Sequence, residues 1–235
     1  MIIKILKQRI IQYGDIAEQI TFTKPVYVHS QENRTYSRSK VEERRNDSLT
    51  RTRNILYQRI YGNIKKHGSF PPIFLTLTIA ENICSLKQSN PLFSDFIRRL
   101  NYRCYTNLKY ICIPEFQERG AVHYHVIFFN LPFIHYSVME EIWGHGSIRI
   151  ELSKNIKNLA AYMAKYLTKD IIDKRLAGHR IIITSKGLLK STIFDNDDIA
   201  LFRDRFILSK ELSFKITPEK KQIKYQIKKY KNKHI

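Results

Sequence analysis

The stretch that decides the fold is PEFQERGAVHYHVIFF, residues Pro114 to Phe129. Two apolar runs flank the segment Glu118–Gly120, and a three-residue loop that ends in glycine is typical of a type I turn closed by a left-handed residue. The stretch therefore predicts a β-hairpin centred on Arg119. Alternate side chains of a strand share a face, so His123 and His125 point to the same side as the apolar residues that follow them.

The same hairpin brings an acidic residue to the two histidines. With the turn centred on Arg119, Glu115 lies directly opposite His123, because both stand four residues from the centre, and directly paired residues point to one face. This register also puts Ile113 beside His125. Two imidazoles and one carboxylate suit a divalent cation with open coordination positions. The sequence therefore predicts a metal site made of Glu115, His123 and His125.

Alternatives to this ligand set stay open. Glu118 is the other nearby carboxylate, although the turn would take it off the strand. A four-residue loop would shift the register and remove Glu115 from the site. Two histidines on one face of a strand also occur where no metal binds.

A second constellation is NLAAYMAKYLTKD, residues Asn158 to Asp170. Tyr162 and Tyr166 lie one helical turn apart on one side, and each is followed three residues later by a lysine, Lys165 or Lys169. One interpretation is an amphipathic helix with aromatic residues at the edge of the core. The other is a pair of nucleophiles, because a tyrosine can attack when its phenolate is accessible and a cation assists it.

The elements expected around these motifs alternate between the two types of secondary structure. Strands are expected at 74–78, 110–116, 122–129, 147–151 and 180–185, and helices at about 48–66, 90–109, 137–143 and 155–174. Strands linked by hairpins and separated by helices indicate the α+β class, with a central antiparallel sheet flanked by helices.

Three segments are expected along the chain. Residues 1–70 form a basic, partly helical region, 71–195 form the α+β domain, and 196–235 form a helical, lysine-rich extension. In the tail, Ile223, Ile227 and Tyr230 follow helical spacing, and a solvated tail is the alternative.

Charge and composition limit the function classes. The chain has 235 residues with 41 Lys and Arg against 21 Asp and Glu, a formal net charge of +20, which favours a polyanionic partner such as nucleic acid. Its three cysteines have no C-x-x-C spacing, which argues against a disulfide framework or a cysteine-rich zinc site. No signal peptide or membrane-spanning run is evident, so we expect a cytoplasmic protein with no membrane partner.

Together, these motifs resemble the HUH endonuclease superfamily. FLTLT, PEFQERGAVHYHVIFF and AAYMAKYLTK are similar to its three motifs, and EIWGHGSIRIE and TSKGLLKS resemble flanking segments. The resemblance runs from about Pro71 to Ser191. It is closest to two-tyrosine rolling-circle replication initiators of bacterial plasmids and microvirus-like single-stranded DNA phages, because the tyrosines follow the histidines. In related conjugative relaxases the tyrosine precedes them.

The resemblance implies a fold, an activity and a set of partners. The fold is like an RNA-recognition domain, with Mg²⁺ or Mn²⁺ held by Glu115, His123 and His125. Tyr162 or Tyr166 cleaves single-stranded or hairpin origin DNA, leaving a 5′-phosphotyrosine and a 3′-hydroxyl primer, and the neighbouring lysines assist. No G-x-x-x-x-G-K-[ST] segment occurs, so a host helicase is expected to unwind the duplex and a host DNA polymerase to extend the primer.

Other residues are weaker candidates, and other functions remain. Candidate DNA contacts are Thr76, Thr78, Arg44, Arg45, Arg51 and Arg53, with Arg34 and Arg38 also in the basic region. His145 is expected to be a turn residue. The alternatives to an initiator are an HUH transposase acting on element ends, and a noncatalytic nucleic-acid-binding module stabilised by zinc.

Overall fold

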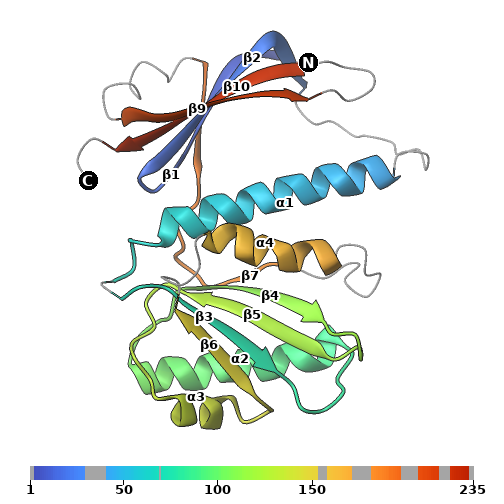
Figure 1. Ribbon diagram of the computed structural model, residues 1–235, viewed down its shortest axis with the longest axis vertical. Coiled ribbons are helices and arrows are strands. Elements are labelled where there is room, and N and C mark those ends of the chain that lie inside the picture. The colour runs from blue at the N-terminus through green and yellow to red at the C-terminus, as the bar shows by residue number, and fades with distance from the viewer. Residues whose placement is uncertain are drawn as a thin grey trace. The chain divides into compact units, whose positions relative to one another are not determined.

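The computed structural model describes residues 3–29, 41–68, 70–152, 158–170, 181–196, 206–216 and 223–232. Contacts within the chain divide it into two compact units (Figure 1). One is Glu43–Leu188, and the other joins Met1–Glu42 to Leu189–Ile235. Each unit has its own five-stranded sheet.

The unit Glu43–Leu188 is built on an antiparallel sheet with the strand order β6-β3-β5-β4-β7. The strands are β3 (Ile73–Thr78), β4 (Tyr110–Phe116), β5 (Val122–Phe128), β6 (Ile148–Leu152) and β7 (Ile183–Thr184). The helices are α1 (Val41–Asn63), α2 (Leu86–Cys104), α3 (Tyr136–Trp143) and α4 (Leu159–Asp170). The predicted α+β class, with a central antiparallel sheet flanked by helices, is confirmed.

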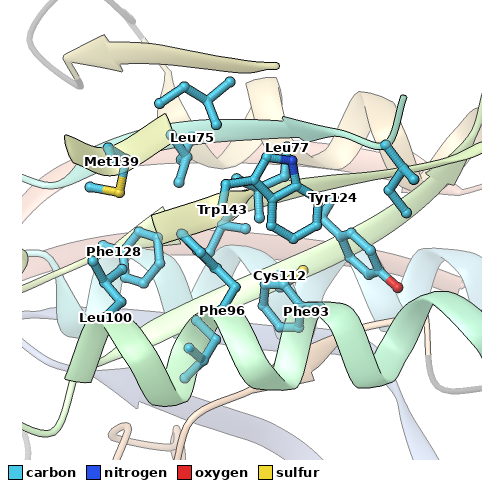
Figure 2. Close-up of a cluster of buried hydrophobic side chains, with 14 of the residues drawn as sticks. Leu75, Leu77, Phe93, Phe96, Leu100, Cys112, Tyr124, Phe128, Met139 and Trp143 are labelled. Carbon is cyan, nitrogen blue, oxygen red and sulfur yellow. The ribbon is translucent and has the colours of Figure 1, made fainter. Parts of the chain in front are cut away.

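Helices cover both faces of this sheet (Figure 1). On one face, α2 and α3 pack against the sheet, and Figure 2 shows Phe93, Phe96 and Trp143 of these helices against Leu75 and other strand side chains. The rings of Phe96 and Trp143 meet edge to face, with centroids 5.6 Å apart. Burial on both faces explains why the strand after the histidines reads as a continuous apolar run.

The opposite face packs against α1 and α4. Leu56 of α1 and Met163 of α4 belong to one buried cluster with Phe74 of β3 and Ile127 of β5. His123 and His125 alternate with Ile127 along β5 and so lie on this second face, as the strand period predicts. The cluster fixes α4 over the strands that carry the histidines.

The other unit is a sheet with the order β8-β1-β2-β10-β9. Its strands are β1 (Ile3–Tyr13), β2 (Ile16–His29), β8 (Thr192–Asp195), β9 (Phe206–Ile216) and β10 (Ile223–Asn232). Arg9 of β1 pairs with Asp195 of β8 at 2.7 Å, and Lys229 of β10 pairs with Glu18 of β2 at 2.8 Å. Segments from both ends of the chain thus build one sheet.

The prediction of a helical C-terminal extension is wrong for its described residues. Ile223, Tyr225 and Ile227 also alternate with polar residues at the period of a strand, and β10 pairs with both β2 and β9. The prediction for residues 1–70 missed the β1–β2 hairpin, because a register shift between Leu6 and Gln8 breaks the alternation of β1.

Two further differences concern boundaries. The helix expected from about residue 48 is described from Val41, since the charged residues before Leu49 are good helix formers that carry no apolar period. The division at residue 70 also differs from the observed units, which place α1 from Glu43 onward with the α+β domain. Within the described residues, no helix is long and apolar enough to cross a membrane.

Candidate active site

The β4–β5 hairpin has the register expected from its turn. Glu115 pairs with His123, and Ile113 pairs with His125. The amide of Gly120 donates to the carbonyl of Gln117 at 2.8 Å, and Gly120 has φ of 92°, a region that favours glycine. The short turn therefore fixes Glu115 and both histidines on one face of the sheet.

A third strand extends this constellation. β3 pairs with the other edge of β5 and sets Thr76 beside His125 and Thr78 beside His123. The Thr76 hydroxyl lies 3.3 Å from Nδ1 of His125, within hydrogen-bonding distance. Both threonines thus line the histidine face, and Thr76 holds the ring of His125.

His125 is the most enclosed member of the group. Its Nε2 lies 2.6 Å from Oε2 of Glu115, and the residue is only 4% exposed. With Thr76 on Nδ1 and Glu115 on Nε2, both ring nitrogens have partners. Contacts on both sides fix the orientation of this imidazole.

His123 differs from His125 in having a nitrogen without a partner. Among the described residues, its Nε2 is buried and makes no hydrogen bond. Burial lowers the pKa of His123 to about 4; His125 and Arg119 also lower it, and Glu115 opposes them. The imidazole is therefore neutral near pH 7, which is the form that binds metals. A buried nitrogen without a partner is costly unless something binds it.

The three residues fit a divalent cation by their chemistry, although they do not form a ready-made ligand cluster. Among the described residues, no three His, Cys, Asp or Glu side chains stand in a metal-binding arrangement. The reason is local, since Glu115 bonds directly to His125 and the two histidine rings have centroids 6.3 Å apart. The donor set and the unpartnered Nε2 of His123 match a cation that would draw the three side chains together.

The tyrosine helix lies over this same face. The ring of Tyr166 stacks on His125 with centroids 3.6 Å apart and planes at 16°. Tyr162 meets Tyr166 edge to face at 5.7 Å and Phe74 at 4.9 Å. The helix therefore brings both predicted nucleophiles next to the predicted metal ligands, which lie some forty residues earlier in the chain.

The surroundings of the two hydroxyl groups differ. The Tyr162 hydroxyl donates to Oε1 of Glu151 on β6 at 3.1 Å. Burial raises the pKa of Tyr166 well above its ordinary value, and the hydrogen bond with Tyr162 and the charges of Glu115 and Glu151 raise it further. Within this structure, Tyr166 is strongly held as a neutral phenol.

Glu151 is a site residue that the sequence interpretation missed. It pairs across the sheet with Phe74, and Arg149 on the same strand reaches its carboxylate at 3.2 Å. The alternation in RIE was an available signal for one shared face. What was missing was the knowledge that β6 lies next to β3.

The lysines of the doubled Y-x-x-K pattern are described unequally. Lys165 is exposed, and its Nζ lies 3.7 Å from the ring centroid of Tyr162 and 5.0 Å from that of Tyr166. This arrangement is a cation–π contact that keeps positive charge beside both tyrosines. Lys169 lies in α4, but its side chain is outside the described part of the structure.

A set of backbone contacts holds the end of β3 against the hairpin. Arg119 in the turn donates to the carbonyls of Ile79 and Ala80. Trp143 donates from Nε1 to the carbonyl of Thr78 at 2.9 Å. Thr78 pairs with His123, so these contacts position the strand next to the predicted metal ligands.

His145 has a structural place. Its ring contacts the edge of Trp143 with centroids 5.2 Å apart, and its carbonyl accepts a hydrogen bond from the amide of Ala80 at 2.8 Å. As expected for a turn residue, it lies in the loop between α3 and β6.

The arginines of the basic region are only partly described. Arg51 is exposed on α1, whereas Arg53 is half-buried and its Nε has no hydrogen-bond partner among the described residues. Arg44 and Arg45 lie in α1 with side chains outside the described part. Arg34 and Arg38 lie outside the described residues, so their DNA contacts stay predictions.

Comparison with known proteins adds one finding. A family model described as a replication-associated protein of the ORF2 family matches residues 72–171. The matched segment runs from just before β3 to just past α4, so it contains the hairpin and both tyrosines. No curated protein and no solved structure matches the chain significantly. The match is consistent with a rolling-circle replication initiator and supports a role in DNA replication.

Proposed function

We propose that this chain is a rolling-circle replication initiator of the two-tyrosine HUH endonuclease type, which nicks and rejoins single-stranded origin DNA. The observation that carries the proposal is the position of Tyr166, whose ring lies on His125 at 3.6 Å. A pair of tyrosines directly over a histidine and carboxylate cluster is the arrangement that a tyrosine nuclease needs. The family match over residues 72–171 supports the same function.

The candidate metal ligands are Glu115, His123 and His125. They present two imidazoles and one carboxylate on neighbouring positions of two strands, and Nε2 of His123 has no other partner among the described residues. When bound, Mg²⁺ or Mn²⁺ would polarise the scissile phosphate and stabilise the charge that develops on it. Thr76 would keep the ring of His125 oriented.

The tyrosines would perform the covalent step. The phenol oxygen of Tyr162 or Tyr166 attacks the phosphate, the bond to the 3′-oxygen breaks, and the 5′-phosphate becomes attached to the protein. The resulting ester keeps the energy of the broken bond, so a free 3′-hydroxyl can later be rejoined. With two tyrosines, one can hold the first end while the other cleaves the regenerated origin.

The surrounding charge suits a single-stranded DNA substrate. The chain carries a formal net charge of +20, and Lys165 adds a cation directly beside the tyrosine rings. Basic surfaces attract the phosphate backbone, most strongly at low salt. In this proposal a host helicase supplies the single strand and a host polymerase extends the 3′-hydroxyl.

The test uses randomised single-stranded oligonucleotides that carry a label at the 3′ end. Incubation with the full chain and Mn²⁺ should give a labelled band that survives denaturing electrophoresis, because the 3′ fragment becomes attached to protein. The double variant Tyr162→Phe, Tyr166→Phe should give no such band. Tyr102→Phe is the matched control, because this tyrosine is 79% exposed on α2.

Two outcomes would contradict the proposal. The absence of any covalent band with the wild-type chain would favour a noncatalytic binding module, especially if purified protein retains zinc. A band that persists in the double variant would exclude these tyrosines. Sequencing the attached DNA and locating that sequence also separates an origin, as one internal site, from transposon ends, as two terminal sites.

A further inference from the structure

The two tyrosines are unequal in the groups that their hydroxyls meet. The Tyr162 hydroxyl donates directly to the carboxylate of Glu151 at 3.1 Å. Tyr166 instead lies flat on His125, and its hydroxyl is hydrogen-bonded to that of Tyr162. Only one of the two nucleophiles is therefore in direct contact with a carboxylate in the contacts just described.

Glu151 is held in place on the histidine face. It pairs with Phe74 of β3, and Phe74 pairs with Ile127 of β5, so the three residues form one row across the sheet. Arg149 stands in the adjacent row, which also contains Thr76 and His125. Strands are about 4.8 Å apart, so the β6 backbone lies only about 10 Å from the strand of the histidines.

The surroundings of Glu151 keep its carboxylate accessible. Its side chain is 24% exposed, and Arg149 contacts the same Oε1 at 3.2 Å with a side chain that is 75% exposed. Oε1 thus meets the tyrosine hydroxyl and an exposed cation at the edge of the sheet. A phosphate approaching Tyr162 from this edge would meet Arg149 as well as Lys165.

We propose that Glu151 is the general base for Tyr162 and that Tyr162 makes the first nick; this inference rests on the proposed function. In this step the phenol oxygen of Tyr162 forms a bond to phosphorus and its proton passes to Glu151. The bond from phosphorus to the 3′-oxygen breaks, and that oxygen takes a proton from water. In the joining step, protonated Glu151 returns a proton to the departing tyrosine oxygen.

The geometry meets the requirement for such a base. A general base must lie within hydrogen-bonding distance of the proton that it removes, about 2.6–3.2 Å between heavy atoms, and the observed distance of 3.1 Å satisfies this. Glu115 is the other carboxylate on this face, but it bonds to His125. The division of labour is therefore one carboxylate for the metal ligands and one for the nucleophile.

The first experiment measures single-turnover adduct formation with an oligonucleotide recovered from the randomised pool and Mn²⁺. Glu151→Gln keeps an oxygen that can accept the tyrosine hydrogen bond but cannot take its proton, so the rate should fall about 100-fold or more. DNA affinity should stay within about twofold. Glu118→Gln makes the same chemical change on the exposed turn and should retain the wild-type rate.

Two further measurements separate catalysis from a structural role. Added formate should partly restore the rate of Glu151→Ala, because a small carboxylate can occupy the vacated space and take the proton. Peptide mass spectrometry of the first wild-type adduct should find the DNA on Tyr162. This mapping needs no variant, so it remains decisive even if the Glu151 variants fold poorly.

The outcomes distinguish this inference from the proposed function. A wild-type chain that forms no adduct overturns the nuclease itself. A wild-type chain that forms its first adduct on Tyr166, or a folded Glu151→Gln variant within threefold of the wild-type rate, overturns the role of Glu151 while the nuclease stands. Failure of formate to restore Glu151→Ala, with Glu151→Gln equally active, also overturns it.

Discussion

The ring of Tyr166 lies parallel to that of His125, with centroids 3.6 Å apart and planes at 16°. Phe74 lies beyond as a further stacked neighbour of both rings, at 6.1 Å from Tyr166 and 5.9 Å from His125. The tyrosine helix is thus joined to the sheet through the residue that also contacts Glu115. A movement of α4 would therefore be felt at the candidate metal site.

Substitution of Tyr166 should separate ring packing from hydroxyl chemistry. Tyr166→Phe keeps the stacked ring, so the free energy of unfolding should stay within about 0.5 kcal/mol of wild type, as is usual when packing is retained. Tyr166→Ala removes the stack and should cost about 1–2 kcal/mol. Urea unfolding followed by circular dichroism measures both. Equal stability of the two variants would show that the stacking contributes nothing.

The His123→Ala variant should lose metal binding. Nε2 of His123 is buried without a partner among the described residues, whereas His125 is already bonded on both nitrogens. Mn²⁺ should raise the thermal unfolding temperature of the wild-type chain, and the affinity of His123→Ala should fall more than about tenfold, as expected when a metal site loses a ligand or its support.

His145→Ala is the matched control for this prediction, because His145 contacts Trp143 and lies in a loop away from the hairpin turn. It should keep the metal-dependent rise in unfolding temperature. If His123→Ala binds Mn²⁺ as tightly as wild type, the ligand assignment is wrong. Retention of full nicking activity in that variant would lead to the same conclusion.

The hairpin register could be predicted because every determinant is local. A short turn with Gly120 sets the pairing of Glu115 with His123, and no residue outside the segment is needed. The strand period then assigns both histidines to one face. Such arguments work wherever pairing partners are joined by a tight turn.

Glu151 could not be found in the same way. Its contact with Tyr162 depends on β6 pairing with β3, which lies more than seventy residues earlier in the chain. No turn links the two strands, so the sequence did not specify their order. The contact also needs α4 to settle on that face of the sheet, which depends on the buried cluster as a whole.

The second sheet failed prediction for a related reason. β1 pairs with β8, and β2 pairs with β10, so each pairing joins opposite ends of the chain. In β10 the apolar residues fit either a helical or a strand period, and long-range pairing decides between them.

Gly146→Ala should destabilise the domain and disturb the end of β3. A Cβ atom at this position would clash with the carbonyl oxygen of Thr78 and lie 2.7 Å from the amide nitrogen of Ala80, and φ is +145°. Both neighbours are backbone atoms, so relief requires movement of the strand next to His123. We expect a loss of about 3 kcal/mol in the free energy of unfolding.

Chemical denaturation measures this loss, and Ser147→Ala is the matched control because Ser147 is exposed next to the same glycine. The control should remain within about 0.5 kcal/mol of wild type. Nicking by Gly146→Ala, measured below its unfolding temperature, should also be slower. A variant as stable as wild type would show that the loop relaxes without moving β3.

Removal of Lys165 should weaken the grip on the DNA backbone beside the tyrosines. Its ammonium group lies 3.7 Å from the ring centroid of Tyr162, on the exposed side of α4, so we expect it to contact a phosphate at the nucleophile. Lys165→Ala should bind single-stranded oligonucleotide more weakly, and the slope of log affinity against log salt should fall by about one. Lys87→Ala removes the same charge from exposed α2, which covers the other face of the sheet, and should leave that slope unchanged. Fluorescence anisotropy across a salt series measures both variants. Equal slopes for Lys165→Ala and the wild type would place the bound strand away from the tyrosine helix.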